Sequence, residues 1–536
     1  MRKLLTFVAA LLITGSVFAG GLVTNTNQSA LFTRLQNRNA STAIDAVYYN
    51  PAGVTKLGEG FFASINNQTI SQTQTIINDY SFLNGSPKEY VGNVSAPLYP
   101  GVYVAYNTGK LSFSAGFNPV GGGGGAKYDN GLPSFEVPIA DLVPMLTSQG
   151  FPTTQYSADI YFKGSSVYFG YQFNVGYKIN DKVSVAAGIR LVSAKNTYKG
   201  YLKNIMIDPT YPAFGATGTM IPASQFFTAG ATTLATLAAG ATQYYSGLQP
   251  IVDGGGGSVL LSNGTIVGLT TAQIGQIQQI LGAAGLDPTN MTIAQAQGSL
   301  GAAAPVFTSG ATEMSDYATQ TQDRSVDAEE SGTGYTPILS VNVSPTDNLD
   351  IAVKYEFKTK MNLTTKVNNN QGGGVFTDGE KIPADMPALL AVGVEYRPID
   401  KLMLTGSFNT YFDKNVDYDG SLTENTDEID KNFLEFGLGA EYALGEKLRI
   451  SGGWVHTTTG VNVYYNSDMR YSANTNSFGA GFGYRINDMI DLNIGGQYTF
   501  YADASRSFTD ITPYTETYKK KTWLIGVGLD FSFGKK

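Results

Sequence analysis

Apolar and polar residues alternate along many short stretches of this chain, and this alternation predicts β-strands. The clearest case is 167–179, where every second residue is apolar or aromatic and the residues between them are mostly glycine or polar. The chain turns at Asn180-Asp181 and alternates again over 183–191. One face stays apolar for about ten residues, the length that a tilted strand needs to cross a bilayer. The pattern therefore predicts membrane-crossing hairpins.

The unit of strand, tight turn and strand recurs along the chain. Six short turns mark six hairpins, at 108–110, 180–181, 346–348, 399–400, 445–446 and 487–488. A further strand begins near Phe61, and a last one runs over about 521–533. The total is fourteen strands, an even number with both termini on the turn side, as bacterial barrels require.

Composition supports a membrane β-protein. Charged residues make up 15% of the chain, whereas there are 33 Tyr, 29 Phe and 63 Gly residues. The mean hydropathy is −0.08, and after the N-terminal segment no apolar run reaches the length of a spanning helix. A net charge of −8 argues against a nucleic-acid partner. A secreted all-β adhesin shares much of this composition and is an alternative.

Residues 1–19 have the features of a secretory signal peptide. Arg2 and Lys3 precede an apolar run over 4–13, and small residues stand at the cleavage positions before Gly20. We expect Sec-dependent export with cleavage near Ala19. Because the chain has no cysteine, a lipoprotein anchor, disulfides and thiolate metal sites are excluded.

The intervals between hairpins are long, as expected for extracellular loops. In the longest, 200–332, the residues Ile274, Ile277 and Leu281 share one face of a short helix that Asp287-Pro288 would stop. We expect a partly helical loop packed over the barrel mouth, because a structureless loop of this length is improbable. A second small domain is the alternative.

Three stretches carry a resemblance to a known family: "YYNPAGVTKL", "AGFNPVGGGGGAKYDNGLP" and "MPALLAVGVEYRPIDKLMLTGSF". In this order, behind a signal peptide and with fourteen strands, they resemble the FadL/TodX family of outer-membrane transporters for long-chain fatty acids and other hydrophobic compounds. The resemblance covers nearly all of the mature chain. It implies a 14-stranded antiparallel transmembrane β-barrel over 59–533, with an N-terminal hatch over 20–58 that plugs the lumen. Residues 534–536 would form a C-terminal tail.

The resemblance also implies site residues. The hatch would turn out of the lumen at Asn50, Pro51, Ala52 and Gly53. In the family a kink in the third strand opens a lateral window, and the residues here are Asn118, Pro119, Gly121, Gly122 and Gly123. Pro119 cannot donate to a ladder and a glycine run has no side chains to hold a pleat, so inter-strand hydrogen bonding should fail there. The alternative is that Pro119 ends the strand and the glycines begin a loop.

Ligand contacts are less defined. A hydrophobic capture groove in the extracellular loops could use Leu142, Met145, Phe151, Phe226 and Phe227, which could equally form the loops' own small cores. Alternation places the basic residues Arg190 and Lys354 in the lumen, where one could hold a carboxylate by a charge-assisted bond. They could instead pair with lumenal acids or anchor the hatch, since buried charges need partners.

The function predicted is passive uptake of long-chain fatty acids or other hydrophobic small molecules across the outer membrane of a Gram-negative bacterium. Outer-membrane lipids and the barrel-assembly machinery are the expected partners, and a single chain supplies enough strands for a monomer. No enzyme, cofactor or metal is predicted, because His456 is the only histidine and no carboxylate cluster has metal-ligand spacing. A general porin for small polar solutes is the main alternative, and it predicts an open lumen without a hatch.

Overall fold

The computed structural model describes residues 26–371, 376–417, 428–509 and 512–534. The predicted signal peptide, 1–19, lies outside these residues. The chain divides into two compact units. One comprises the chain up to 137, together with 160–201 and 325–536, and the other comprises 138–159 and 202–324.

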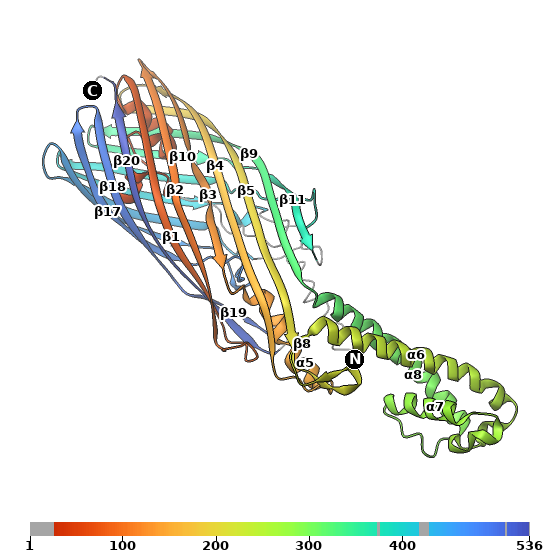
Figure 1. The fold of residues 1–536 in the computed structure, drawn as a ribbon. Coiled ribbons are helices and arrows are strands. Elements are labelled where there is room, and N and C mark those ends of the chain that lie inside the picture. The colour runs from red at the N-terminus through yellow and green to blue at the C-terminus, as the bar shows by residue number, and fades with distance from the viewer. Residues whose placement is uncertain (1–25, 372–375, 418–427, 510–511, 535–536) are drawn as a thin grey trace. The chain divides into compact units, whose positions relative to one another are not determined.

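The first unit is a closed antiparallel β-barrel (Figure 1), in which β1 pairs with both β2 and β20. Its fourteen wall strands in the described residues are β1 (Gly60–Asn78), β2 (Lys88–Thr108), β3 (Leu111–Tyr128), β4 (Tyr156–Lys178), β5 (Val183–Ile207), β9 (Arg324–Thr346), β10 (Leu349–Glu356), β13 (Leu389–Ile399), β14 (Leu402–Tyr411), β15 (Phe433–Ala443), β16 (Leu448–Thr458), β17 (Thr475–Asn487), β18 (Ile490–Tyr501) and β20 (Tyr514–Ser532). All six predicted turns join neighbouring strands of this set. The predicted last strand is longer than expected, since it begins at Tyr514.

Shorter strands extend the ladders beyond the wall. β11 (Asn362–Gln371) pairs with β9 and with β12 (Lys381–Pro383), and β19 (Ala504–Phe508) pairs with β20. Short 3₁₀ turns lie between wall strands at η5 (Asp413–Asn415) and η7 (Val463–Tyr465).

The outer surface of the barrel is apolar and the inner surface is mostly buried against other parts of the unit. Outward side chains such as Phe173, Leu438 and Trp523 are about half exposed, whereas their strand neighbours facing inward are buried. This is the period-two pattern of a barrel with lipid on its outside. The predicted transmembrane barrel is therefore confirmed.

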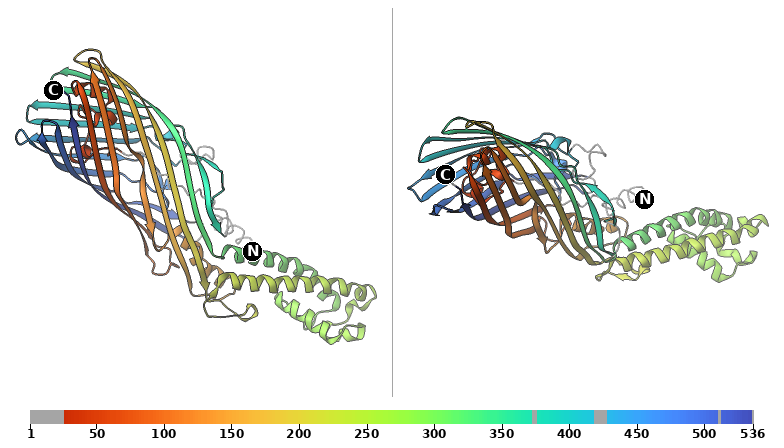
Figure 2. Two further views of the ribbon diagram at one scale, coloured as in Figure 1. Left: turned by 45° about the horizontal axis from the view of Figure 1, so that its top comes forward. Right: turned by 90° about the horizontal axis from the view of Figure 1, so that it is seen from above.

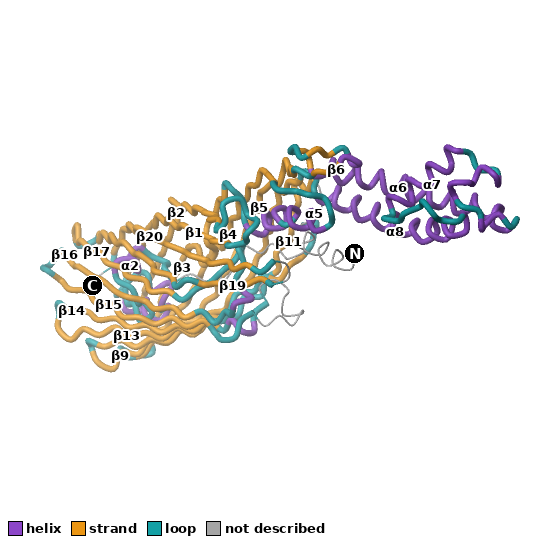
Figure 3. Tube along the Cα trace, turned by 90° about the horizontal axis from the view of Figure 1, so that it is seen from below, coloured by secondary structure: helices purple, strands orange, loops and turns teal. Residues whose placement is uncertain are grey.

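Of the predicted hatch, 20–58, residues 20–25 lie outside the described residues, and 26–58, called the hatch below, lie inside the barrel. They form α2 (Ala30–Arg34), α3 (Ala46–Tyr49) and η1 (Pro51–Lys56), which Figure 3 shows within the ring of strands. The side chain of Ser29 caps α2 by accepting a hydrogen bond from the Phe32 amide at 3.0 Å. Val47 and Tyr48 of the hatch belong to one apolar cluster with Tyr103 and Val192 of the wall. The hatch is thus part of the barrel's core.

The second unit is mainly helical, and within it α6 and α8 run side by side in both views of Figure 2. Its elements are α5 (Leu142–Ser148), β6 (Thr210–Tyr211), η2 (Pro212–Phe214), β7 (Ala216–Thr217), β8 (Ile221–Pro222), α6 (Ala223–Asp253), η3 (Gly256–Ser258), η4 (Leu261–Val267), α7 (Thr271–Ala283) and α8 (Ile293–Gln320). One more helix, α4 (Pro133–Ala140), spans the boundary between the units. None of the helices in the described residues is long and apolar enough to cross a membrane.

The helix expected around Ile274 is α7, so the helical part of the loop prediction is confirmed. Ile274, Ile277 and Leu281 are buried in the unit's own core, and a capping box at Thr270 begins the helix. The helix ends before the predicted stop, because Gly285 takes a left-handed φ of 77°. α6 and α8 were not predicted, since their Ala, Gly and Thr residues give little contrast between faces. Packing over the barrel mouth stays a prediction.

Candidate functional site

The wall of the barrel is interrupted between β2 and β3. Pairing of these strands runs from the turn to Val102–Phe117, stops, and resumes at Val94–Ala126. Residues 95–101 and 118–125 therefore face each other without ladder pairs, and we call this the β2–β3 gap. On its other side β3 stays paired with β4 through Pro119–Phe169 and Gly125–Ser165, with two register shifts. Pro119 therefore does not end the strand.

Prolines and glycines on both strands account for the gap. Pro97 and Pro100 of β2 and Pro119 of β3 have no amide hydrogen to donate. Gly122 and Gly124 adopt positive φ angles of 90° and 74°, which take the backbone away from strand geometry. The sequence interpretation named Pro119 and the glycines but missed Pro97 and Pro100. A count of prolines within the second predicted strand would have found them.

Side chains span and line the gap. The Tyr99 hydroxyl donates to the Pro119 carbonyl oxygen across it at 2.9 Å. Asn118 turns inward and its amide donates to Gln28 Oε1 of the hatch at 2.5 Å. The hydroxyl of Tyr103 donates to the Gln28 carbonyl oxygen at 2.6 Å. The hatch therefore lies directly behind the gap.

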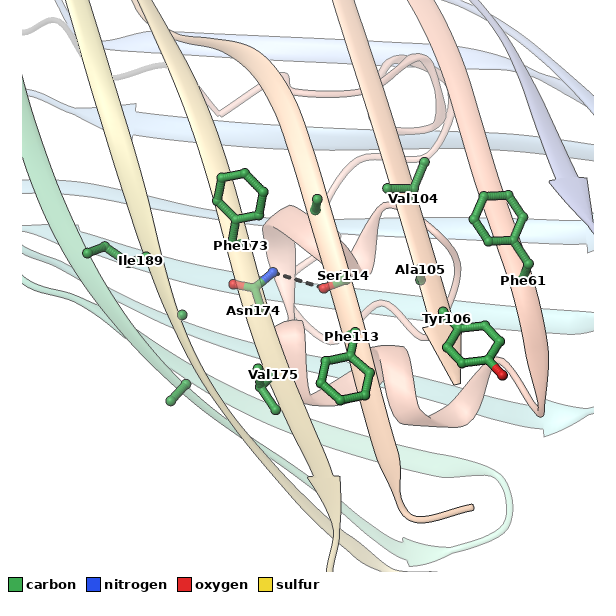
Figure 4. A pocket seen from close by; sticks show the side chains of 13 residues that line it. Phe61, Val104, Ala105, Tyr106, Phe113, Ser114, Phe173, Asn174, Val175 and Ile189 are labelled. Carbon is green, nitrogen blue, oxygen red and sulfur yellow. Dashed lines mark hydrogen bonds between the residues drawn. The ribbon is translucent and has the colours of Figure 1, made fainter. Parts of the chain in front are cut away.

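A hollow on the lipid-facing side lies on the same strands, between the gap and the turns. Its volume is about 620 Å³. The outward apolar side chains lining it are Phe61, Val104, Tyr106, Phe113, Phe173, Val175 and Ile189 (Figure 4), above a floor that includes Ala115, Ala187 and Gly188. Behind it Asn174 and Ser114 are joined by a hydrogen bond of 3.0 Å. Val104 and Ala115, which line the hollow, are each two residues from Val102 and Phe117, the β2–β3 pair that borders the gap on the side of the turn.

The four predicted residues of the hatch turn come together inside the barrel. Asn50 donates to Asn342 Oδ1 of β9 at 2.8 Å and to the Ser41 carbonyl oxygen at 3.1 Å. The Ala52 carbonyl oxygen accepts from the Ser184 hydroxyl of β5 at 2.8 Å. A Cβ on Gly53 would lie 2.5 Å from the Ser41 carbonyl oxygen, so only glycine fits. Pro51 is the first residue of η1.

The predicted lumenal basic residues also come together, but around a shared acid. Arg190 donates to both oxygens of Glu356, at 2.6 and 2.9 Å. Lys354 donates to Glu356 Oε1 at 2.7 Å and to the Tyr48 carbonyl oxygen at 2.9 Å. Both cations lie over the Tyr48 ring, at 4.8 and 4.5 Å from its centroid. Arg190 and Lys354 were predicted either to hold a ligand carboxylate or to pair with lumenal acids and anchor the hatch. The observed contacts are those of the second alternative.

Other charges fix the hatch in the same way. Arg34 forms an ion pair with Glu441 and donates to Asn493 Oδ1 at 2.8 Å. Arg38 pairs with Asp45 at 2.9 Å within the hatch. Burial by itself lowers the pKa of Arg38, but the Asp45 carboxylate outweighs it and holds that pKa above its ordinary value. The hatch is therefore held by buried charges that are paired with carboxylates.

A cavity of about 10 Å³ lies among Phe32, Tyr48 and Tyr49 of the hatch and Tyr411 and Glu435 of the wall. This volume is about that of one water-sized probe. Among the described residues, no group of three His, Asp or Glu side chains could hold a metal ion.

The predicted capture residues lie in the second unit, and the three phenylalanines among them are in contact through Phe226. Leu142, Phe226 and Phe227 are buried, and Met145 is half-buried. The Phe151 ring contacts Phe226, with ring centroids 5.7 Å apart. They form part of the unit's own core, as in the alternative interpretation, and no groove lined by them is observed in the described residues.

An aromatic cluster in the barrel was missed by the sequence interpretation. It contains Tyr90, Tyr128, Phe162, Tyr198 and Tyr518, all on inward-facing positions of five strands. Aromatic residues at the inward phase of the alternation were the available signal.

These features define a class of protein, the fourteen-stranded membrane barrel with an internal plug and an interrupted wall. The structure is similar to that of a FadL homologue from Pseudomonas aeruginosa, with a TM-score of 0.57 and 12% identity, covering 96% of this chain and 100% of that one. It is also similar to a deletion mutant of the monoaromatic hydrocarbon channel TodX, with a TM-score of 0.50 and 11% identity, covering 95% and 99% of the two chains. No protein-family model and no curated protein sequence matches the chain. The chain thus has the FadL fold, and the predicted resemblance is confirmed at the level of the fold.

Proposed function

We propose that this protein is an outer-membrane transporter for passive uptake of long-chain fatty acids or similar hydrophobic compounds, which it releases sideways through the β2–β3 gap. The observation that carries the proposal is the absence of ladder pairs between 95–101 and 118–125 in the wall of a plugged barrel. The fold shared with a FadL homologue and with a hydrocarbon channel supports it. Export by the predicted signal peptide, assembly by the barrel machinery and action as a monomer belong to the same proposal.

Sideways release into lipid avoids the free-energy cost of releasing an apolar ligand through the lumen into water. An acyl chain loses about 0.8 kcal/mol for every methylene exposed to water, so ten methylenes cost about 8 kcal/mol. Straight passage also meets the hatch, which leaves only about 10 Å³ in the cavity beside it. A ligand leaving through the gap instead reaches lipid, next to the apolar hollow formed by β1 to β5. Transport would be driven by the ligand's own gradient and by partitioning into the bilayer.

Ligand capture by the extracellular loops is part of the proposal, but the five residues suggested from sequence give it no support. Leu142, Phe226 and Phe227 are already covered by their own unit. The porin alternative is disfavoured, because an open aqueous lumen is incompatible with a hatch whose side chains are almost all buried.

A disulfide can lock β2 to β3 at the end of the gap next to the Val94–Ala126 pair, so that the two strands cannot separate there. A Cβ on Gly124 would lie 3.9 Å from the Cβ of Ala96 across the gap, within the range of about 3.5–4.5 Å that a disulfide needs. The chain has no cysteine, so the double variant Ala96→Cys/Gly124→Cys can form only this bond. Uptake of radiolabelled oleate by cells lacking other fatty-acid transporters should fall at least tenfold when the variant is oxidised. It should recover in dithiothreitol.

A matched control places the disulfide between β3 and β4, which pair without a gap at this position. A Cβ on Gly125 would lie 3.3 Å from the Cβ of Ser165 on β4, slightly below that range, so Gly125→Cys/Ser165→Cys needs a shift of a few tenths of an ångström to link two strands that are already paired. This control should transport equally in both redox states. Equal transport by the oxidised gap variant would refute lateral release, and lack of oleate uptake by the unaltered protein would refute the transport function.

A further inference from the structure

Within the described residues, the inward-facing Lys520 has no carboxylate partner. Lys520 lies on β20 in the same phase as the buried residues Tyr518 and Leu524, opposite to the exposed Trp523 and Ile525. Its ammonium lies 4.7 Å from the centroid of the Tyr471 ring and 5.6 Å from that of Tyr501. No ion pair joins it to any acid in the described part of the chain. The side chain is half-buried, so part of it stays accessible.

This arrangement differs from that of the other lumenal cations. Arg34, Arg190 and Lys354 each contact a buried glutamate. A desolvated ammonium costs free energy unless it is paired, and two aromatic faces compensate only part of that cost. An ammonium also has three N–H donors, which ring faces do not satisfy. Lys520 is therefore suited to accept an anion from outside the chain.

The polar groups around Lys520 are engaged elsewhere. The Tyr471 hydroxyl donates to the Lys519 carbonyl oxygen at 2.8 Å, and the Tyr501 hydroxyl is 3.1 Å from Thr522 Oγ1. Gln74, which pairs with Lys520 across β1, accepts from the Tyr128 hydroxyl at 2.8 Å.

The acid on the same strand face is also committed. Glu516 is four residues away, about 13 Å along the strand. It accepts hydrogen bonds from Asn78 at 3.1 Å and from Tyr518 at 2.6 Å. Among the residues that the structure describes, the cation is thus left with aromatic neighbours and no acid paired with it.

The surroundings of Lys520 combine one positive charge with apolar aromatic rings. Tyr471 stacks on Tyr518, with ring centroids 5.1 Å apart, and both belong to the aromatic cluster inside the barrel. A ligand with an apolar body and one negative head group matches a cation at the margin of such a cluster. A neutral hydrocarbon would leave the ammonium without an acceptor.

We infer that Lys520 binds the carboxylate of an acyl ligand within the lumen and so makes the protein selective for anionic amphiphiles over neutral hydrophobic compounds. Tyr471 and Tyr501 hold the ammonium in place. The inference rests on the proposed transport function and narrows its substrate class.

The test compares two ligands that differ only in the head group. Equilibrium binding of radiolabelled oleate and of oleyl alcohol is measured for the purified protein and for the variants Lys520→Met and Lys520→Arg. We expect Lys520→Met to raise the Kd for oleate about tenfold, the scale of a lost charge-assisted bond, and to leave the Kd for oleyl alcohol unchanged. Lys520→Arg keeps the charge and should stay within about threefold of the unaltered protein for both ligands.

Lys519→Met is the matched control, because Lys519 is the next residue, is exposed, and lies 3.5 Å from Asp503. It should bind both ligands normally. An unchanged oleate Kd in Lys520→Met, or an equal loss for oleate and alcohol, would overturn the inference while leaving transport in place. If the unaltered protein binds neither ligand, the proposed function itself fails.

Discussion

Replacing Glu356 by Gln tests whether the lumenal charges anchor the hatch. The carboxylate accepts three hydrogen bonds from two cations, Arg190 and Lys354, and all three side chains are at most 7% exposed. The substitution keeps the size of the side chain and removes its charge. It leaves two buried cations without a counter-ion. Arg190 keeps two hydrogen bonds to Gln172 Oε1, Lys354 keeps one to the Tyr48 carbonyl oxygen, and both still lie over the Tyr48 ring, but none of these partners carries a negative charge.

The expected loss is large. Removing one partner of a buried ion pair costs about 3–5 kcal/mol, because the remaining charge stays desolvated. Two cations depend on this one acid, but their contributions are not additive, so we expect the free energy of unfolding to fall by about 3–5 kcal/mol. Because an unpaired ammonium is driven toward water, Lys354 should leave its buried position and break its hydrogen bond to the Tyr48 carbonyl oxygen, which loosens the hatch.

The assay is reversible folding of the barrel into lipid vesicles in guanidinium chloride, followed by the fluorescence of Trp454 and Trp523. Glu329→Gln is the matched control, because Glu329 pairs with Lys195 at 3.0 Å on the surface, where both side chains are more than one third exposed. Exposed pairs contribute about 0–1 kcal/mol, so this control should lose no more than that. A similar small loss for both variants would refute the view that the lumenal pair anchors the hatch.

Two further predictions concern the gap and the hatch turn. Gly122→Ala should lower the free energy of unfolding by more than about 1 kcal/mol, because the φ of Gly122 is 90° and the new Cβ would lie 2.3 Å from the Ser166 carbonyl oxygen. Gly123→Ala is the control: its Cβ would meet nothing within 4 Å, so it should change the free energy of unfolding by less than about 0.5 kcal/mol. Equal effects of the two variants in the same vesicle assay would contradict this geometry. Asn50→Ala removes the hydrogen bonds to Asn342 and to the Ser41 carbonyl oxygen, at a cost of about 1–3 kcal/mol, and should make ion conductance in planar bilayers more frequent. Silent bilayers together with unchanged stability would show that this turn does not hold the hatch.

Local patterns determined the barrel. Alternation along 167–179 and the short turns at residues such as Asn180-Asp181 predicted strand number and connectivity correctly, because each strand must present one face to lipid and the other to the interior. Pro119 and the glycine run indicated where hydrogen bonding fails, because a missing donor and a missing Cβ are properties of single residues. The short helix around Ile277 was also predictable from a local pattern, because its apolar residues recur at helical spacing.

Contacts between distant strands were decided only by the tertiary structure. Glu356 meets Arg190 from 166 positions away, and nothing near either residue indicates that partner. In the β2–β3 gap, Pro97 and Pro100 lie in the unpaired stretch of β2 that faces the unpaired stretch of β3 with Pro119, and this juxtaposition depends on the register between the two strands rather than on either sequence. The side chain of Phe226 is apolar in any fold, and only packing places it inside its own unit instead of on a groove. Lys519 and Lys520 are neighbours of the same residue type. The phase of β20 decides that Lys520 faces the interior, and the fold brings Tyr471 beside it.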